Sequence, residues 1–229
     1  AGEPLGISQD EVRFSGHAME ARLYAEDPAQ GFLPATGPVL AWRPPEGPGI
    51  RCDHGLAEGQ EITAYYDPMV AKVIAWGPNR EEARRKLLMA LDQTVLLGPV
   101  HNRSFLRALL AHPAFIAGEV TTSFLSDRMD EGDEAFAPHE VSGETFAVAA
   151  ALWLEGNTPA STASSAWRSA GTSRTHLSLT AGADQRAIRA TRDDKSGGWA
   201  VQVADEDPRE VTLLGETAVH RRVSVGGHQ

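Results

Sequence analysis

The first 77 residues alternate short stretches of strand-like hydrophobic patterning with turns rich in proline and glycine. In HAMEARLYAE, residues 17–26, apolar and polar side chains alternate with the period of a strand that has one buried side. One face carries Met19, Ala21 and Leu23, and the other carries Glu20, Arg22 and Tyr24. After the turn region DPAQGFLPATGP, further strands are predicted in PVLAW, GIRCDH and EITAYY, and a more buried one in MVAKVIAW.

Two helices are predicted next. The first starts in NREEARRKLLMALDQT, where Asn79 is the expected N-cap and Glu82 completes a pair like a capping box. Its apolar stripe comprises Ala83, Leu87, Leu88, Leu91 and Val95, and its solvent face carries the pairs Glu81–Arg85 and Glu82–Lys86. The second helix runs from about Asn102 and ends at His112, because a residue before proline is disfavoured in helical conformation.

The pattern changes in SDRMDEGDEAFAPHE, an acidic stretch broken by glycine and proline that indicates a linker. GETFAVAAALWLEG predicts one apolar helix, and NTPASTASSAWRSAGTS predicts a long polar loop. From residue 174 the chain predicts successive antiparallel strands, in RTHLSLTA, QRAIRATRD, GWAVQVAD, REVTLLG and HRRVSVGG. Five strands and one helix form an incomplete barrel, and the sequence begins without an initiator methionine, so we expect the parent protein to continue beyond both ends of this sequence.

Composition narrows the class of protein. The chain has 229 residues and a net charge of −10, which argues against nucleic acid or an anionic membrane as the main partner. Cys52 is the only cysteine, so no internal disulfide can form, and a reducing compartment is expected. The sequence shows no membrane-spanning run and no signal peptide.

Most candidate chemistry in the sequence has a structural explanation. Cys52 and His54 share a strand face and could form a nucleophilic pair, but a half-buried cysteine beside a turn histidine is the favoured interpretation. The eight histidines lack metal-site spacing, so we predict no metal site in this chain. The sequence also lacks a GxxxxGK[ST] phosphate loop and a GxGxxG turn.

Arg51 is the sharper candidate. On GIRCDH it shares a face with Asp53, opposite Ile50 and Cys52. One interpretation is a surface ion pair of little consequence. The other is a rigid guanidinium directed at a planar anion or carbonyl. The pattern alone does not choose between them.

Several separated segments, in order and with matching spacing over residues 5–125, resemble the C-terminal part of biotin carboxylase domains. They are GHAMEARLYAEDPAQGFLPATG, GIRCDHGLAEGQEITAYYDPMVAKVIAWGPNREEA, LLGPVHNRSFL and HPAFIAGEVTTSFL. The forms Ala-Glu-Asp-Pro, Tyr-Asp-Pro-Met and Thr-x-Phe-Leu are most similar to the biotin-containing α subunits of acyl-CoA carboxylases, namely the methylcrotonoyl-, geranyl- and propionyl-CoA enzymes.

The resemblance implies an α+β fold: the C-terminal lobe of an ATP-grasp biotin carboxylase, followed by a helix and an incomplete antiparallel β-barrel. It also implies a ligase that uses ATP and Mg2+ to activate bicarbonate and then carboxylates biotin. The family's Gly-x-Arg arginine, which contacts the biotin ureido oxygen, corresponds to Arg51. We therefore expect Arg51 to be both the catalytic and the biotin-binding residue, while Glu20, Arg22 and Lys72 support the lobe.

Some family motifs are missing from the sequence. The Glu-x-Asn-x-Arg and Gln-Val-Glu-His segments, the ATP-binding lysines, the glycine-rich lid and the biotin-attachment motif Ala-Met-Lys-Met are all absent. We therefore expect the isolated chain to be inactive, with the ATP and Mg2+ sites mostly outside it. The expected domains are the carboxylase lobe (1–126), an acidic linker (127–143) and a truncated bridging domain (144–229).

The implied partners are the rest of the biotin carboxylase domain, the carboxyltransferase β subunit and the biotin carrier domain. The implied compartment is the cytoplasm in a bacterium or the mitochondrial matrix in a eukaryote. An alternative function is that of a non-catalytic docking module for the carboxyltransferase subunit, formed by the helix and strands after residue 140.

Overall fold

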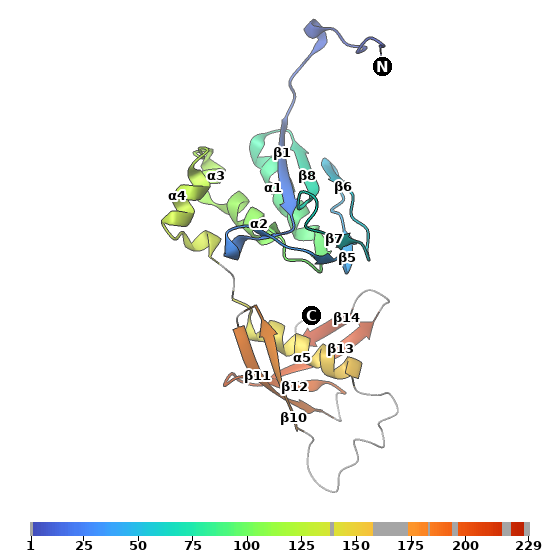
Figure 1. The fold of residues 1–229 in the computed structure, drawn as a ribbon, viewed down its shortest axis with the longest axis vertical. Helices are drawn as coiled ribbons and strands as arrows, with labels where there is room; N and C mark the ends of the chain where they lie inside the picture. Colours follow the sequence, from blue (N-terminus) through green and yellow to red (C-terminus); the bar gives the residue numbers. More distant parts are fainter. Residues whose placement is uncertain are drawn as a thin grey trace. The chain divides into compact units, whose positions relative to one another are not determined.

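The computed structural model describes residues 2–137, 140–157, 174–182, 184–193, 197–216 and 221–226. The chain divides into two compact units, residues 1–138 and 139–229 (Figure 1). The strands of the first unit are β1 (His17–Tyr24), β2 (Glu26–Asp27), β3 (Leu33–Pro34), β4 (Gly37–Pro38), β5 (Ala41–Arg43), β6 (Ile50–His54), β7 (Glu61–Ile62), β8 (Met69–Gly77) and β9 (Val95–Leu97). Its helices are η1 (Gln9–Glu11), η2 (Pro28–Gln30), α1 (Arg80–Gln93), α2 (Arg103–Ala111), α3 (Pro113–Ala117), α4 (Phe124–Asp130) and η3 (Glu134–Phe136).

An antiparallel sheet with the order β1-β8-β6 forms the framework of the first unit. The predicted alternation is confirmed on β1, since Ala21 and Leu23 are buried while Glu20 and Arg22 face solvent. Helix α1 packs against the buried side of the sheet (Figure 1). This core comprises Ala21, Val73, Ala75, Leu87, Ala90, Leu91 and Leu110. The opposite side of the sheet is left for charged residues.

Helix α1 begins as predicted. Asn79 Oδ1 accepts a hydrogen bond from Glu82 N at 2.9 Å, so the asparagine caps the first turn. Two details of the prediction are wrong. Val95 belongs to strand β9, because the helix ends at Gln93. Glu82 bonds back to Asn79, while Lys86 reaches the Trp76 carbonyl instead of pairing with Glu82.

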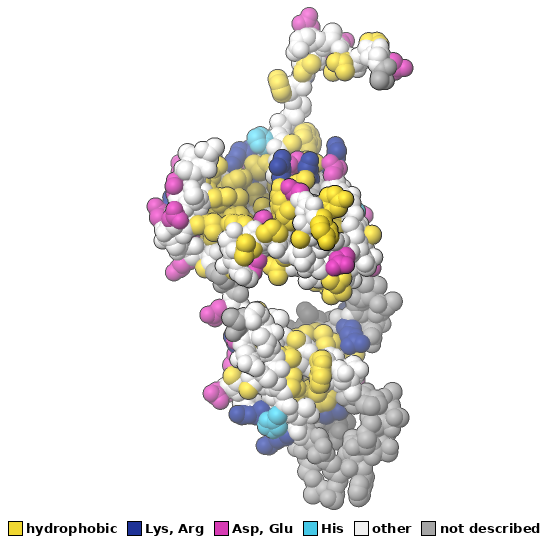
Figure 2. All heavy atoms as spheres, viewed as in Figure 1, with side chains coloured by type: hydrophobic (Ala, Val, Ile, Leu, Met, Phe, Trp, Pro, Cys, Tyr) yellow, Lys and Arg dark blue, Asp and Glu magenta, His cyan; other side chains and the backbone are white. Residues whose placement is uncertain are grey.

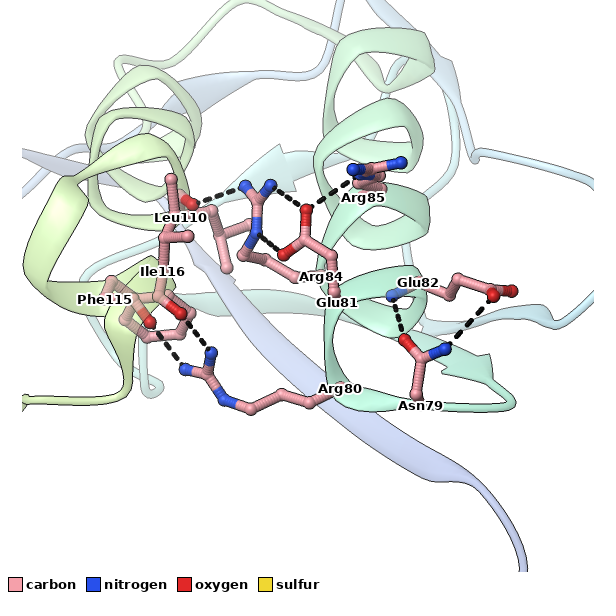
Figure 3. A network of polar contacts seen from close by, with 9 residues as sticks. All are labelled: Asn79, Arg80, Glu81, Glu82, Arg84, Arg85, Leu110, Phe115 and Ile116. Atoms are coloured by element: carbon pink, nitrogen blue, oxygen red, sulfur yellow. Dashed lines mark hydrogen bonds and ion pairs between the residues drawn. The ribbon is translucent and has the colours of Figure 1, made fainter.

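Arginines of α1 hold the two helices that follow the sheet (Figure 3). Arg80 donates to the carbonyl oxygens of Phe115 and Ile116, and Arg84 donates to that of Leu110. These oxygens lie at or next to the C-terminal turns of α3 and α2, where carbonyl groups lack partners within the helix. The guanidinium groups therefore donate to carbonyl oxygens at these helix ends, and the Phe115 oxygen also accepts from Gly118 N at 3.2 Å.

Short strand pairs extend the first unit around a second apolar cluster. Strand β4 pairs with β7, and β5 with β9. Their cluster includes Leu23, Ala25, Val39, Trp42, Ile62, Ala71 and Leu96. The predicted strand EITAYY is wrong beyond Ile62, because Tyr65 and Tyr66 lie in an exposed turn rather than in β7.

The second unit contains helix α5 (Gly143–Asn157) and one antiparallel sheet. The strands follow one another in space as in sequence: β10 (Arg174–Ala181), β11 (Asp184–Arg192), β12 (Trp199–Val203), β13 (Arg209–Glu216) and β14 (Arg221–Val225). Helix α5 packs on this sheet through Phe146, Ala147, Ala150, Ala151 and Leu154. Within the described residues the sheet is open, with β10 and β14 as its edges, so no closed barrel is present.

The stretch predicted as a linker, 127–143, contains the end of α4 and all of η3. Asp133 caps η3 by accepting a hydrogen bond from Ala135 N, and it also contacts His112 Nε2 at 3.2 Å. The first part of this stretch is thus attached to the first unit. The predicted loop around SAWRS lies outside the described residues.

Candidate functional site

The open face of the sheet β1-β8-β6 carries a row of charged side chains. Lys72 on the central strand lies directly opposite Arg22 on β1 and Asp53 on β6 in the strand registers. Glu20 and Arg51 both lie opposite Ile74. Since residues paired across strands share a face of the sheet, all five charged side chains project from the side away from α1.

Arg51 and Asp53 form a two-pronged ion pair on β6. Arg51 Nε donates to Asp53 Oδ1 and Nη2 to Oδ2, both at 2.8 Å. This contact raises the pKa of Arg51 and lowers that of Asp53. The Arg51 side chain remains 73% exposed, and Nη1 makes no hydrogen bond to any residue that the structure describes. The guanidinium therefore has donors available for a planar acceptor.

Gly49 determines how β6 begins beside β8. Its φ is +77°, and a Cβ at this position would lie 2.7 Å from the Trp76 carbonyl oxygen. The same approach allows Trp76 N to donate to Gly49 O at 2.7 Å. Only glycine tolerates both the positive φ and the close contact. The glycine two residues before Arg51 thus sets the register that places the arginine on the open face.

The remaining charges of the row differ in how firmly they are held. Arg22 contacts Glu20 through a single hydrogen bond at 3.2 Å. Lys72 contributes to the lowered pKa of Asp53, because its positive charge favours the carboxylate form. Of these three residues, Lys72 is the one that acts on the Arg51–Asp53 pair.

Cys52 and His54 are not assembled as a nucleophile and base. His54 Nδ1 accepts a hydrogen bond from Trp42 Nε1 at 3.1 Å, and the two rings meet edge to face. Cys52 packs against the buried core. Burial, with a contribution from Asp53, raises the pKa of its thiol, which reduces the thiolate form that a nucleophile requires. The structural interpretation of this pair is therefore favoured.

Sequence reasoning missed that the side chain of Asn102 holds the end of β1 by hydrogen bonds. Its Oδ1 accepts from Tyr24 N at 3.0 Å, and its Nδ2 donates to Glu26 Oε1 at 2.9 Å and to Arg22 O at 3.3 Å. The side chain occupies the outer edge of β1, where a neighbouring strand would otherwise pair. A polar residue just before a helix was visible in the sequence, but only the tertiary fold places it against β1.

A hollow of about 350 Å³ lies along the outer edge of β1. Its lining is mainly apolar, and Figure 2 shows hydrophobic side chains exposed on this side of the first unit. Glu20, Arg22 and Asn102 add polar groups to the wall. Among the described residues, no group of three or more His, Cys, Asp or Glu side chains could hold a metal ion. In the same part of the chain, no helix is long and apolar enough to cross a membrane.

Comparisons with known proteins identify relatives of this chain. Residues 20–127 match the family model described as the biotin carboxylase C-terminal domain. The propionyl-CoA carboxylase α chain of Ruegeria pomeroyi is 42% identical over 171 residues, covering 66% of this chain and 25% of the relative. The mitochondrial methylcrotonoyl-CoA carboxylase subunit α of Arabidopsis thaliana is 46% identical over 125 residues, covering 54% of this chain and 17% of the relative.

Solved structures show the same relationship. The biotin carboxylase domain of Hydrogenobacter thermophilus 2-oxoglutarate carboxylase, crystallised with MgADP and bicarbonate, matches with a TM-score of 0.57 and 35% identity. The match covers 61% of this chain and 30% of that domain. Rhizobium etli pyruvate carboxylase gives a TM-score of 0.60 and 34% identity over 67% of this chain and 14% of that enzyme.

The chain thus spans about a quarter or less of the length of these curated relatives. The resemblance stated from the sequence motifs is confirmed, as is the expected α+β fold with the ATP-grasp carboxylases as its structural neighbours. Residues 20–127 belong to the biotin carboxylase C-terminal domain family, and the relatives they match include the α subunits of propionyl-CoA and methylcrotonoyl-CoA carboxylases.

Proposed function

We propose that this chain supplies the C-terminal lobe of a biotin carboxylase in an acyl-CoA carboxylase α subunit, and that Arg51 faces the ureido group of biotin. The observation that carries the proposal is the Arg51 guanidinium, fixed by Asp53 on an open sheet face with Nη1 available. The domain match and the α-subunit relatives support the reaction class.

The proposed role of Arg51 follows from the chemistry of the ureido group. When the ring nitrogen of biotin loses its proton, negative charge moves onto the ureido oxygen. A permanently charged, preorganised guanidinium stabilises this charge, and one such donor contributes on the order of 3 kcal/mol to a transition state. The exposed side of Arg51 fits a planar oxygen acceptor.

ATP, Mg2+ and bicarbonate are proposed for the assembled enzyme. The printed sequence lacks the family's Glu-x-Asn-x-Arg and Gln-Val-Glu-His motifs, so the residues that hold MgATP and remove the proton come from other polypeptide. The isolated chain is accordingly inactive. The acyl-CoA is selected by a carboxyltransferase subunit, and the relatives include both bacterial and mitochondrial enzymes.

The test is bicarbonate- and biotin-dependent ATP hydrolysis. The chain is assayed alone and as a chimera in which it replaces the segment that it matches in the Ruegeria α chain. We expect no activity alone, activity in the chimera, and loss of about 100-fold or more in kcat for Arg51→Ala. Arg85→Ala is the matched control, because Arg85 is 72% exposed and contacts Glu81 at 2.8 Å. Activity of the isolated chain, or an unaffected Arg51→Ala chimera, contradicts the proposal.

The second unit supports the docking alternative, in which it binds the carboxyltransferase subunit. Two large hydrophobic side chains of this unit are exposed. Trp153 on α5 is 54% exposed, and Leu214 on β13 is 45% exposed. Large exposed hydrophobic side chains are common at protein interfaces. Binding of the whole chain to the carboxyltransferase subunit of a relative tests this, with Trp153→Ser expected to weaken it. Equal binding by the variant contradicts a role for this surface.

A further inference from the structure

We propose that Asp53 is the positioning residue of the site: it clamps one edge of the Arg51 guanidinium so that the other edge is presented to the ureido oxygen. This inference rests on the proposed function, which assigns the ureido contact to Arg51. Nothing in the domain match itself assigns a role to Asp53.

The clamp follows from strand geometry. Arg51 and Asp53 are two residues apart on β6, so their side chains leave the same face of the strand. Both carboxylate oxygens are used, one by Nε and one by Nη2, at 2.8 Å each. A guanidinium held at two nitrogens cannot rotate about its last bonds without breaking a contact. Its Nη1 and the second N–H of Nη2 are thus directed away from Asp53.

The register with β8 keeps the clamp in place. Arg51 lies opposite Ile74 and Asp53 opposite Lys72, so β6 cannot slide without losing its ladder to the central strand. The hydrogen bonds from Arg51, with a smaller contribution from the Lys72 charge, lower the pKa of Asp53 and so favour its ionised form. The carboxylate is therefore available as an acceptor throughout the neutral pH range.

A neighbouring pair shows what is specific to this arrangement. Glu20 and Arg22 on β1 have the same two-residue spacing and lie on the same sheet face. Their contact is a single hydrogen bond at 3.2 Å, so Glu20 holds the Arg22 guanidinium at one nitrogen only. Spacing alone does not produce a two-pronged clamp. The clamp at Arg51 is the feature that distinguishes a directed guanidinium from an ordinary surface charge.

The first experiment measures the clamp directly on the whole chain. The 15N-labelled protein reports solvent exchange of the Arg51 Nε–H. We expect exchange several-fold faster in Asp53→Asn and nearly native in Asp53→Glu. Glu131→Gln is the matched control, because it removes the carboxylate partner of the exposed Arg128. An Arg51 Nε–H whose exchange is unchanged in Asp53→Asn overturns the inference.

The second experiment measures the consequence in the active chimera. With free biotin as substrate, Asp53→Asn is expected to lower kcat/KM about tenfold or more, since small misplacements of a catalytic group reduce rate strongly. Asp53→Glu is expected to recover most of this loss, and KM for bicarbonate and the thermal unfolding midpoint are expected to stay unchanged. If Arg51→Ala is inactive while Asp53→Asn matches Glu131→Gln, this inference alone fails. If Arg51→Ala is fully active, the proposed function is contradicted, and this inference, which rests on it, is contradicted as well.

Discussion

Arg84 crosses from α1 to α2 and donates its Nη1–H to the carbonyl oxygen of Leu110 at 2.8 Å (Figure 3). The same guanidinium holds Glu81 through Nε and Nη2, both at 2.7 Å. Arg84 is buried, so its contact with the Leu110 carbonyl is sheltered from water, whereas the Glu81 side chain is 39% exposed. One side chain thus joins the first turn of α1 to the C-terminal end of α2.

Replacing Arg84 is therefore expected to destabilise the first unit. Arg84→Met keeps much of the aliphatic packing but leaves the Leu110 carbonyl and the Glu81 carboxylate without this partner. We expect a loss of about 2 kcal/mol in the free energy of unfolding, the cost of leaving a buried polar group unsatisfied. Urea denaturation monitored by tryptophan fluorescence measures this. Arg85→Met, at the exposed partner of Glu81, is expected to cost less than about 0.5 kcal/mol.

Glu81 predicts a defined acid dependence of stability. Hydrogen bonds from Arg84 and Arg85 lower the pKa of its carboxyl group from 4.5 to about 2. A carboxyl group whose pKa is lower in the folded state contributes stability above its unfolded pKa and loses it as the pH falls through the folded pKa. The difference in unfolding midpoint between the native chain and Glu81→Gln should be constant above about pH 5 and should shrink between pH 4.5 and 2. A difference that does not vary with pH over this range contradicts the assignment.

The hydrogen bonds of Asn102 predict that the stability of the first unit requires an amide at this position. Asn102→Asp keeps the acceptor for Tyr24 N but removes the donors to Arg22 O and Glu26 Oε1, and it places a second carboxylate beside Glu26. We expect a destabilisation of about 2–3 kcal/mol at neutral pH, partly relieved at pH 4. Thermal unfolding at both pH values measures it. Asn157→Asp is the control, because Asn157 is exposed and, among the residues that the structure describes, donates to Trp153 O alone; little change is expected there.

Cys52 predicts slow alkylation. Because burial raises the pKa of its thiol, iodoacetamide should modify Cys52 more slowly than free cysteine at pH 7.5, and unfolding in urea should abolish the protection. A thiolate activated by His54 would instead react faster than free cysteine. Mass spectrometry of the modified chain over time distinguishes slow from fast alkylation. Fast modification of the folded chain would support the interpretation of Cys52 as a nucleophile.

Local patterning was sufficient for much of this fold. The alternation on β1 and the Asn79 cap of α1 were both predictable, because each depends on a few neighbouring residues. The errors arose where contacts with segments distant in the sequence determine the local structure. Val95 continues the helical hydrophobic period, but it belongs to β9 and lies opposite Arg43 of β5. Lys86 donates to the Trp76 carbonyl oxygen rather than pairing with Glu82. Asn102 likewise depends on a strand 78 residues away in sequence.

The candidate site, like the fold, has features that local sequence predicts and features that depend on contacts between distant segments. Spacing placed Arg51 and Asp53 on one face, since the period of a strand is two residues. The motif resemblance, rather than spacing, assigned the arginine to biotin. Neither could show that both oxygens of Asp53 hold the guanidinium or that Gly49 must approach Trp76. Those facts depend on how β6 meets β8, where the paired residues are 17 to 25 positions apart in the sequence.

Arg51→Lys tests whether the fork of donors, and not just positive charge, matters. A lysine keeps the charge but has a single nitrogen, which cannot both satisfy the two oxygens of Asp53 and donate to a ureido oxygen in fixed geometry. In the active chimera we expect kcat with free biotin to fall about 100-fold, with thermal stability unchanged. Arg85→Lys is the matched control at an equally exposed arginine and should retain native activity. Near-native activity of Arg51→Lys would mean that charge alone serves the reaction, and the directed guanidinium would then have no role.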